Sequence, residues 1–85
     1  MVSVVLPSLL AAQAGGRKQF DVDAATVGLA LRALPVADLI FDGSAGLRPL
    51  VNVYLDGADV RGMDGLATPV SGGQTVRVVA AVAGG

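Results

Sequence analysis

The chain has few side chains that could catalyse a reaction on their own. Cysteine and histidine are both absent from its 85 residues, which removes thiolate chemistry, imidazole acid–base catalysis, disulfides and nearly every zinc site. Seven aspartates, one tyrosine and scattered serines and threonines remain. An aspartate without a partner group is a weak acid or base near neutral pH, so Asp42, Asp64 or Ser71 would be poor catalysts. The sequence predicts that the chain is not an enzyme.

Length and composition indicate one small apolar domain. A chain of 85 residues and 8.4 kDa can bury a single core. The apolar fraction of 53% and the mean hydropathy of +0.67 exclude a disordered chain and indicate that apolar surface stays exposed. The net charge of −1 leaves no basic run for a phosphate backbone, so nucleic acid is not an expected partner.

The first 16 residues carry no charged side chain, and Ala12-Gln13-Ala14 resembles the cleavage pattern of a secretory signal. However, no Lys or Arg precedes the apolar run, Pro7 interrupts it, and it is too short to span a bilayer as a helix. We therefore expect a strand here, no association with a membrane, and a cytoplasmic protein.

Alternating apolar residues predict five short strands. Phe20 and Val22 are expected to point inward, and Asp56-Gly57 is a strong turn signal before a short return strand. Gly72-Gly73 is expected to make a further turn. The predicted strands are Val2–Leu6, Arg17–Val22, Val51–Leu55, Ala58–Arg61 and Val76–Val82.

One helix is predicted between the second and third strands. Thr26 is a plausible N-cap, and apolar residues then recur at helical spacing. Pro35 disfavours helical geometry at the residue before it. The residues of the expected buried stripe are Val27, Ala30, Leu31 and Leu34.

The segment 35–46 has no clean period, so its conformation is not predicted. Within it, Leu39, Ile40 and Phe41 are expected to fill the edge of the core, and Leu66 is expected to fill the core beneath a later loop.

This order of elements is compatible with an α+β fold of the β-grasp type, with one main helix packed across a mixed sheet of four to five strands. The first and last strands would then lie side by side. We expect a folded domain over residues 1–82 and a tail over residues 83–85.

Three stretches carry a family resemblance: Val51–Arg61, Asp64–Val70 and Val76–Gly85. They resemble the ubiquitin-like sulfur carriers, which include the small subunit of molybdopterin synthase, the thiamine carrier and the cysteine-biosynthesis carrier. Similarity to the actinobacterial cysteine carrier is greatest, through Gly65-Leu66-Ala67-Thr68 and the ending Ala81-Val82-Ala83-Gly84-Gly85. A bare Gly-Gly is a weak signal, but Gly-Gly directly after a strand in a chain with this element order is a much stronger one.

The resemblance implies chemistry at the carboxyl group of Gly85. A partner enzyme would adenylate this group, and a sulfur donor would then replace AMP to leave a thiocarboxylate. Gly84 would form the thin stem that enters the partner's site, because glycine has no Cβ to block a narrow channel. Ala83 would contact the partner beside this stem. The chain would bind no cofactor itself, since the partner would supply the sites for ATP and Mg²⁺.

The resemblance also implies the partners. One is a ubiquitin-activating-like adenylyltransferase or sulfurtransferase. Another is a synthase that accepts the sulfur: a pyridoxal phosphate cysteine synthase, a thiosugar synthase or the large subunit of molybdopterin synthase. In the cysteine branch a metalloprotease releases the product from the tail.

Strict strand alternation predicts a docking face on the side of the sheet opposite the helix. This face is partly apolar, whereas the solvent face of an antiparallel sheet is ordinarily polar. Plain β-propensity is the simpler explanation of the same residues. The candidate contact residues are Val5, Tyr54, Val79 and Ala81, with Arg61 and Arg77 adding charge complementarity.

Three other functions stay open. The chain could be the small subunit of molybdopterin synthase, a ubiquitin-like modifier conjugated through Gly85, or a permanent structural subunit whose tail acts as a wedge. Lys18 is the only lysine, so chains of a modifier could grow on no other side chain.

Overall fold

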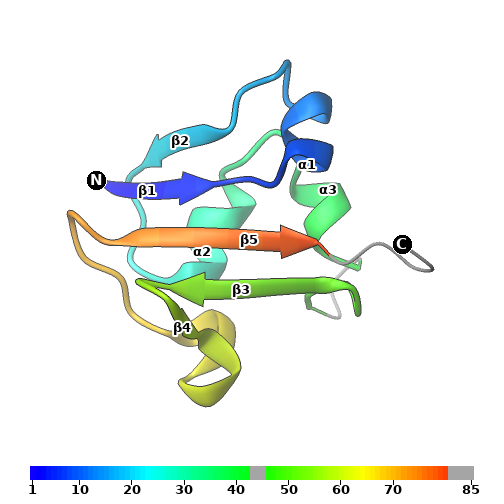
Figure 1. The fold of residues 1–85 in the computed structure, drawn as a ribbon. Coiled ribbons are helices and arrows are strands. Elements are labelled where there is room, and N and C mark those ends of the chain that lie inside the picture. Colours follow the sequence, from blue (N-terminus) through cyan, green and yellow to red (C-terminus); the bar gives the residue numbers. More distant parts are fainter. Residues whose placement is uncertain (43–45, 81–85) are drawn as a thin grey trace.

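The protein folds around a mixed five-stranded sheet (Figure 1). The computed structural model describes residues 1–42 and 46–80. The sheet order is β2-β1-β5-β3-β4, with β1 parallel to β5 and the other neighbours antiparallel. The first and last strands are therefore side by side, as predicted. The strands are β1 (Val2–Val5), β2 (Gln19–Val22), β3 (Val51–Leu55), β4 (Ala58–Asp59) and β5 (Thr75–Ala80).

The predicted helix is α2 (Val27–Arg32), which lies behind the sheet in Figure 1. The Thr26 hydroxyl accepts a hydrogen bond from the Leu29 backbone amide at 3.2 Å, which confirms the N-cap. Two further helices, α1 (Ser8–Gln13) and α3 (Ala37–Ile40), were not predicted. Both are too short to be stable alone, so they depend on packing against the core. Two short 3₁₀ helices, η1 (Val60–Gly62) and η2 (Gly65–Ala67), follow β4.

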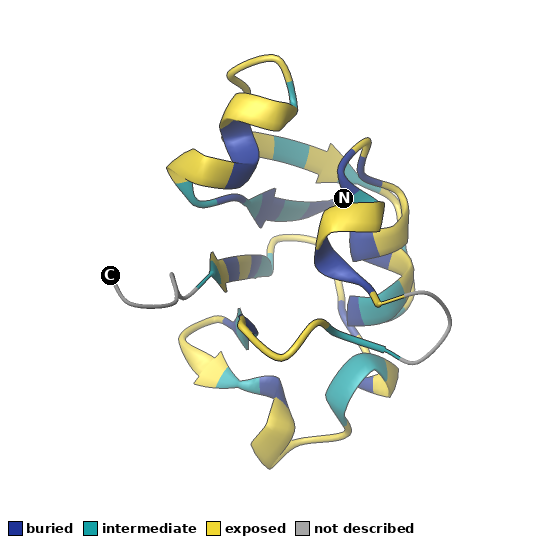
Figure 2. Cartoon of the chain, turned by 90° about the vertical axis from the view of Figure 1, so that its right-hand side faces the viewer, coloured by how far each residue is buried: buried dark blue, intermediate teal, exposed yellow. Residues whose placement is uncertain are grey.

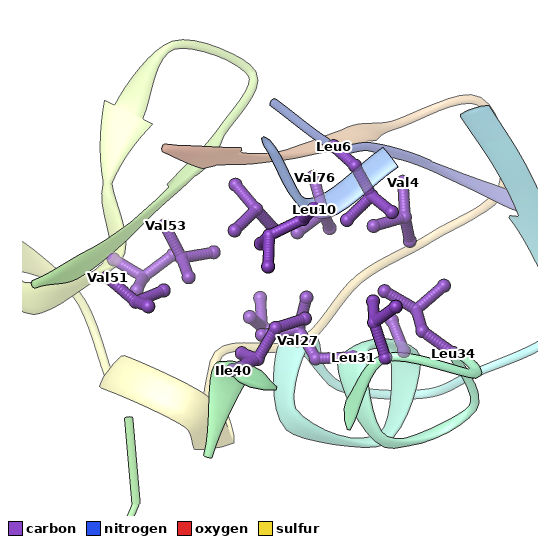
Figure 3. Close-up of a cluster of buried hydrophobic side chains, with 14 of the residues drawn as sticks. Val4, Leu6, Leu10, Val27, Leu31, Leu34, Ile40, Val51, Val53 and Val76 are labelled. Carbon is purple, nitrogen blue, oxygen red and sulfur yellow. The ribbon is translucent and has the colours of Figure 1, made fainter. Parts of the chain in front are cut away.

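The core lies between the sheet and the helices, where their apolar side chains point toward one another (Figure 3). The predicted stripe of α2 is buried throughout. The alternation of β1, β3 and β5 also holds, because every second residue is buried. The inward residues of these strands are Val2, Val4, Val51, Val53, Leu55, Val76 and Val78.

Glycine meets a conformational need at the β3–β4 turn. Asp56 and Gly57 have φ of 49° and 88°, as the predicted tight hairpin requires. The Asp56 carboxylate also accepts hydrogen bonds from the Thr75 amide at 2.9 Å and from Gln74 Nε2 at 3.1 Å. This aspartate therefore has a structural role at the start of β5.

Several details of the prediction were wrong. Ile40 and Phe41 are buried as expected, but Leu39 is 40% exposed because one turn of α3 directs it away from the core. The return strand ends at Asp59, since the Asp59 carboxylate caps η1 by accepting a hydrogen bond from the Arg61 amide at 2.9 Å. Leu66 is only partly buried.

The last strand is β5, which begins one residue earlier than predicted, at Thr75, and is described to Ala80. Its predicted end at Val82 and the domain boundary after that residue lie outside the described residues. No helix within residues 1–42 and 46–80 is long and apolar enough to cross a bilayer.

Truncation of Leu31 tests the role of α2 in the core. Leu31 is fully buried and Leu29, on the same helix, is 55% exposed. We expect Leu31→Ala to lower the free energy of unfolding by about 2–5 kcal/mol, through lost burial and a cavity. The control Leu29→Ala should change it by less than about 0.5 kcal/mol. Urea unfolding followed by circular dichroism gives both values, and equal effects would contradict this packing.

Candidate functional site

The root of the tail is fixed by the central strand of the sheet. β5 pairs with β1 on one side and with β3 on the other, and its last pair joins Ala80 to Val51. In Figure 1, β1 and β5 point toward the end of the sheet where α1 and α3 lie. The predicted site residues Ala81, Ala83, Gly84 and Gly85 lie outside the described residues.

The structure brings four predicted docking residues together on the sheet face opposite α2. Arg77 of β5 pairs with Val5 of β1 and with Tyr54 of β3, so these three side chains form one row across the sheet. Val79 lies two residues further along β5 and is 38% exposed. Alternating bands along β5 in Figure 2 follow this division, since Val76 and Val78 are buried. We call Val5, Tyr54, Arg77 and Val79 the sheet-face patch.

Arg61 lies at the same end of the sheet as the root of the tail. It belongs to η1, and its Nη2 atom donates a hydrogen bond to the Val51 carbonyl oxygen at 3.3 Å. Because Val51 pairs with Ala80, this contact brings the guanidinium close to the last described residue of β5. Arg61 is therefore not part of the row of the sheet-face patch, but it lies near the end of the sheet where β5 reaches Ala80.

Charged residues lie at both ends of the sheet. At the tail end, the Lys18 carbonyl oxygen accepts a hydrogen bond from the Leu6 amide, and Arg61 reaches Val51. At the opposite end, Asp23 follows β2 and Asp56 follows β3. These contacts place the Lys18 backbone and the Arg61 guanidinium near the end where β5 reaches Ala80, and Asp38 of α3 lies beside Arg48 near the same end.

Sequence reasoning missed a groove beside the root of the tail. Its volume is about 630 Å³, and we call it the tail-side groove. Three of its leucines are unusually exposed: Leu9 at 61%, Leu39 at 40% and Leu50 at 48%. The sequence signal that could have revealed this groove was the run of apolar residues, including Leu9, in the uncharged first segment. The lining residues are Leu9, Leu10, Gln13, Leu39, Arg48, Leu50, Val51 and Ala80.

Two hydroxyl groups among the described residues have structural roles. The Thr26 hydroxyl caps α2, and the Thr68 hydroxyl donates to the Gly65 carbonyl oxygen at 2.7 Å. Residues 1–42 and 46–80 contain no group of three acidic side chains that could hold a metal ion.

Comparisons with known proteins find similar sequences. A model described as the ThiS family matches residues 4–85. The chain is 33% identical over 91 residues to the sulfur carrier protein CysO of Mycobacterium tuberculosis, covering 99% of this chain and 98% of that protein. It is 41% identical over 70 residues to small archaeal modifier protein 3 of Haloferax volcanii, covering 74% and 73%.

Solved structures confirm the predicted β-grasp fold. The crystal structure of M. tuberculosis CysO superposes with a TM-score of 0.84 at 29% identity, covering 96% of this chain and all (100%) of that one. A crystal structure of the Amycolatopsis orientalis BexX/CysO complex gives a TM-score of 0.84 at 30% identity and covers 100% of both chains.

A pair of neighbouring valines on β5 tests the two-faced character of the sheet. Val78 is buried and Val79 is exposed. We expect Val78→Asp to abolish cooperative folding because it buries an unpaired carboxylate. Val79→Asp should lower the free energy of unfolding by about 1 kcal/mol or less. Urea unfolding of both variants is the measurement, and unfolding of Val79→Asp would contradict an accessible patch.

Proposed function

This chain belongs to the ThiS family, and on that premise we propose that it is a sulfur carrier charged at the carboxyl group of Gly85. The observation that supports this most is the match over 99% of the chain to a sulfur carrier protein. The geometry is compatible, because a tail that starts from the central strand is held on both sides at its root. The carrier would be a protein co-substrate rather than an enzyme.

The charging reaction has two substitution steps. A carboxylate oxygen of Gly85 attacks the α-phosphorus of ATP, and pyrophosphate leaves to give an acyl adenylate. A sulfur nucleophile then attacks the carbonyl carbon, the bond to AMP breaks, and a thiocarboxylate remains. In this proposal the partner enzyme binds ATP and Mg²⁺, and the Mg²⁺ ion stabilises the charge that develops on the phosphates.

The folded domain has the role of a handle in this reaction. An extended chain advances about 3.3–3.6 Å per residue, so the five residues after Ala80 can reach at most about 18 Å. The partner's active centre must therefore approach the tail end of the sheet. Glycine at the last two positions leaves the carboxyl group without a neighbouring side chain.

The sheet-face patch is the proposed contact with the adenylating enzyme. Val5, Tyr54 and Val79 provide apolar area that water covers in the free chain. Arg77 lies between the first two, and Arg61 lies near the tail root, so both can steer an acidic partner surface toward the tail.

The sulfur acceptor is the second proposed partner. Similarity to CysO favours delivery to a pyridoxal phosphate cysteine synthase, with release of the product by a metalloprotease. The BexX/CysO complex supports docking of a carrier of this shape onto a partner protein. A thiosugar synthase and the large subunit of molybdopterin synthase are the alternative acceptors.

A ubiquitin-like modifier is the second candidate function, supported by the 41% identity to small archaeal modifier protein 3. In this case a lysine amine of a target, rather than a sulfur donor, would attack the acyl adenylate and displace AMP. The two functions share the adenylation step and differ in the nucleophile.

Incubation with the cognate adenylating enzyme, ATP, Mg²⁺ and sulfide tests the sulfur-carrier proposal. We expect the intact chain to gain the mass that replacement of one oxygen by sulfur produces, at Gly85. A chain that lacks Gly84 and Gly85 is the control and should gain nothing. No gain on the full chain would overturn the proposal, and a Gly-Gly remnant on lysines of other proteins would favour the modifier. A partner complex that survives the deletion unchanged would instead favour a permanent structural subunit.

Substitution of Val79 tests the sheet-face patch. We expect Val79→Asp to raise the Kd for the adenylating enzyme by about tenfold or more, because a carboxylate would be desolvated in an apolar contact. Leu29→Asp, at an exposed side chain of α2 outside the sheet-face patch, should leave the Kd within about twofold. Calorimetric titration gives both constants, and an unchanged Kd for Val79→Asp would exclude the patch from the interface.

A further inference from the structure

The tail-side groove is a second apolar surface, next to Ala80, and it shares no residue with the sheet-face patch. It is formed by α1, α3 and the residues that lead into β3, and Ala80 forms part of its wall. The last described residue before the reacting tail therefore belongs to the groove. A protein that draws the tail into its active centre must come close to this wall.

The exposed leucines of the groove are not explained by folding. Leu10 and Val51 belong to the core, but Leu9, Leu39 and Leu50 each have 40% or more of their surface accessible. Three such residues around one hollow are an apolar patch of the kind that marks a contact site. Among the described residues, the other large apolar side chains of similar exposure are scattered: Met1, Leu29 and Met63.

One wall of the groove is basic. The Arg48 guanidinium donates to the Asp38 carbonyl oxygen from Nε at 3.2 Å and from Nη2 at 2.8 Å, which holds it in place. Arg48 also lines a neighbouring hollow of about 320 Å³ with Arg32 and Asp38. Arg32 is itself fixed, with its guanidinium carbon 4.1 Å from the centre of the Phe41 ring. Arg48 of the groove and Arg32 of the neighbouring hollow therefore place two guanidinium groups, against the one carboxylate of Asp38, on this side of the molecule.

We propose that the tail-side groove binds an apolar segment of the adenylating enzyme that carries a carboxylate facing Arg48. This inference rests on the proposed function, because it assumes that this enzyme receives the tail. The apolar part of the segment would cover Leu9, Leu39 and Leu50. The carboxylate would pair with a guanidinium that is already positioned, so little side-chain entropy is lost on binding.

A partner segment fits the groove better than a second copy of the chain. In a two-fold dimer the groove of one copy would face the groove of the other, whose lining contains Arg48 and no acidic residue, so the two Arg48 charges would repel without an acidic partner. An acidic partner has no such repulsion. Contact at the groove and at the sheet-face patch would also hold the carrier on two sides of the tail root, and this fixes the direction in which the tail enters.

Opposite charges at position 50 test the proposal. We expect Leu50→Asp to raise the Kd of the full chain for the adenylating enzyme by about tenfold or more, since it adds repulsion to lost apolar contact. Leu50→Lys loses the same contact but gains attraction, so its Kd should rise several-fold less. Leu29→Asp and Leu29→Lys, at a leucine of similar exposure outside the groove, are the matched controls and should both stay near the wild-type Kd. Urea unfolding verifies that all four variants are folded.

The possible outcomes distinguish an acidic partner segment in the groove from no contact there, from a segment that is not acidic and from a second copy of the chain. Equal Kd values for Leu50→Asp and Leu29→Asp would overturn the proposal while thiocarboxylate formation on the wild-type chain still supported the proposed function. A stronger effect of Leu50→Lys than of Leu50→Asp would overturn the acidic partner segment. A wild-type dimer in sedimentation that Leu50→Asp dissociates would assign the groove to a second copy. Absence of any thiocarboxylate on the wild-type chain would overturn the proposed function and this inference with it.

Discussion

The pairing of β5 on both sides is the constraint on which the rest of the structure depends. Its hydrogen bonds to β1 and β3 make the C-terminal strand the centre of the sheet. A C-terminal strand at a sheet edge could fray, whereas this one cannot move without breaking two ladders. The domain can therefore hold Ala80 firmly while the proposed chemistry takes place beyond it.

The same strand separates the core from the surface that faces partners. Val76 and Val78 pack toward α2, and Arg77 and Val79 face the other side, because side chains alternate along a strand. Burial of one set stabilises the fold without using the other. This division explains how a chain of 85 residues can leave apolar side chains on its surface and still possess a complete core. The proposed docking residues Arg77 and Val79 and the last described residue, Ala80, are then parts of one strand.

Strong local periodicity made most of the fold predictable. The spacing of Val27, Leu31 and Leu34 specified α2, and the alternation from Val51 to Leu55 specified β3, since burial of one face dictates both patterns. The segments that failed are those where tertiary packing outweighs local preference. α1 and α3 are single turns or little more, and their sequences carry no cap that marks them.

The candidate site was predictable to the same extent. Alternation predicted that Val5, Tyr54 and Arg77 share one face, but their pairing in a single row depends on the register of the sheet, which was not predicted. The tail-side groove did not follow, because Leu9, Leu39 and Leu50 come from three separate segments that only the folded chain brings together. The basic rim of the groove depends on the hydrogen bond from Arg48 to the Asp38 carbonyl oxygen, and no sequence pattern predicts this contact.

The most direct measurement of the central claim is the mass of the C-terminal peptide of the chain isolated from its own cells, with and without the gene for the adenylating enzyme. The account predicts that a fraction of the peptide from normal cells contains sulfur in place of one carboxyl oxygen at Gly85, and that this fraction disappears without the enzyme. A peptide that always ends in an ordinary carboxyl group would contradict the account.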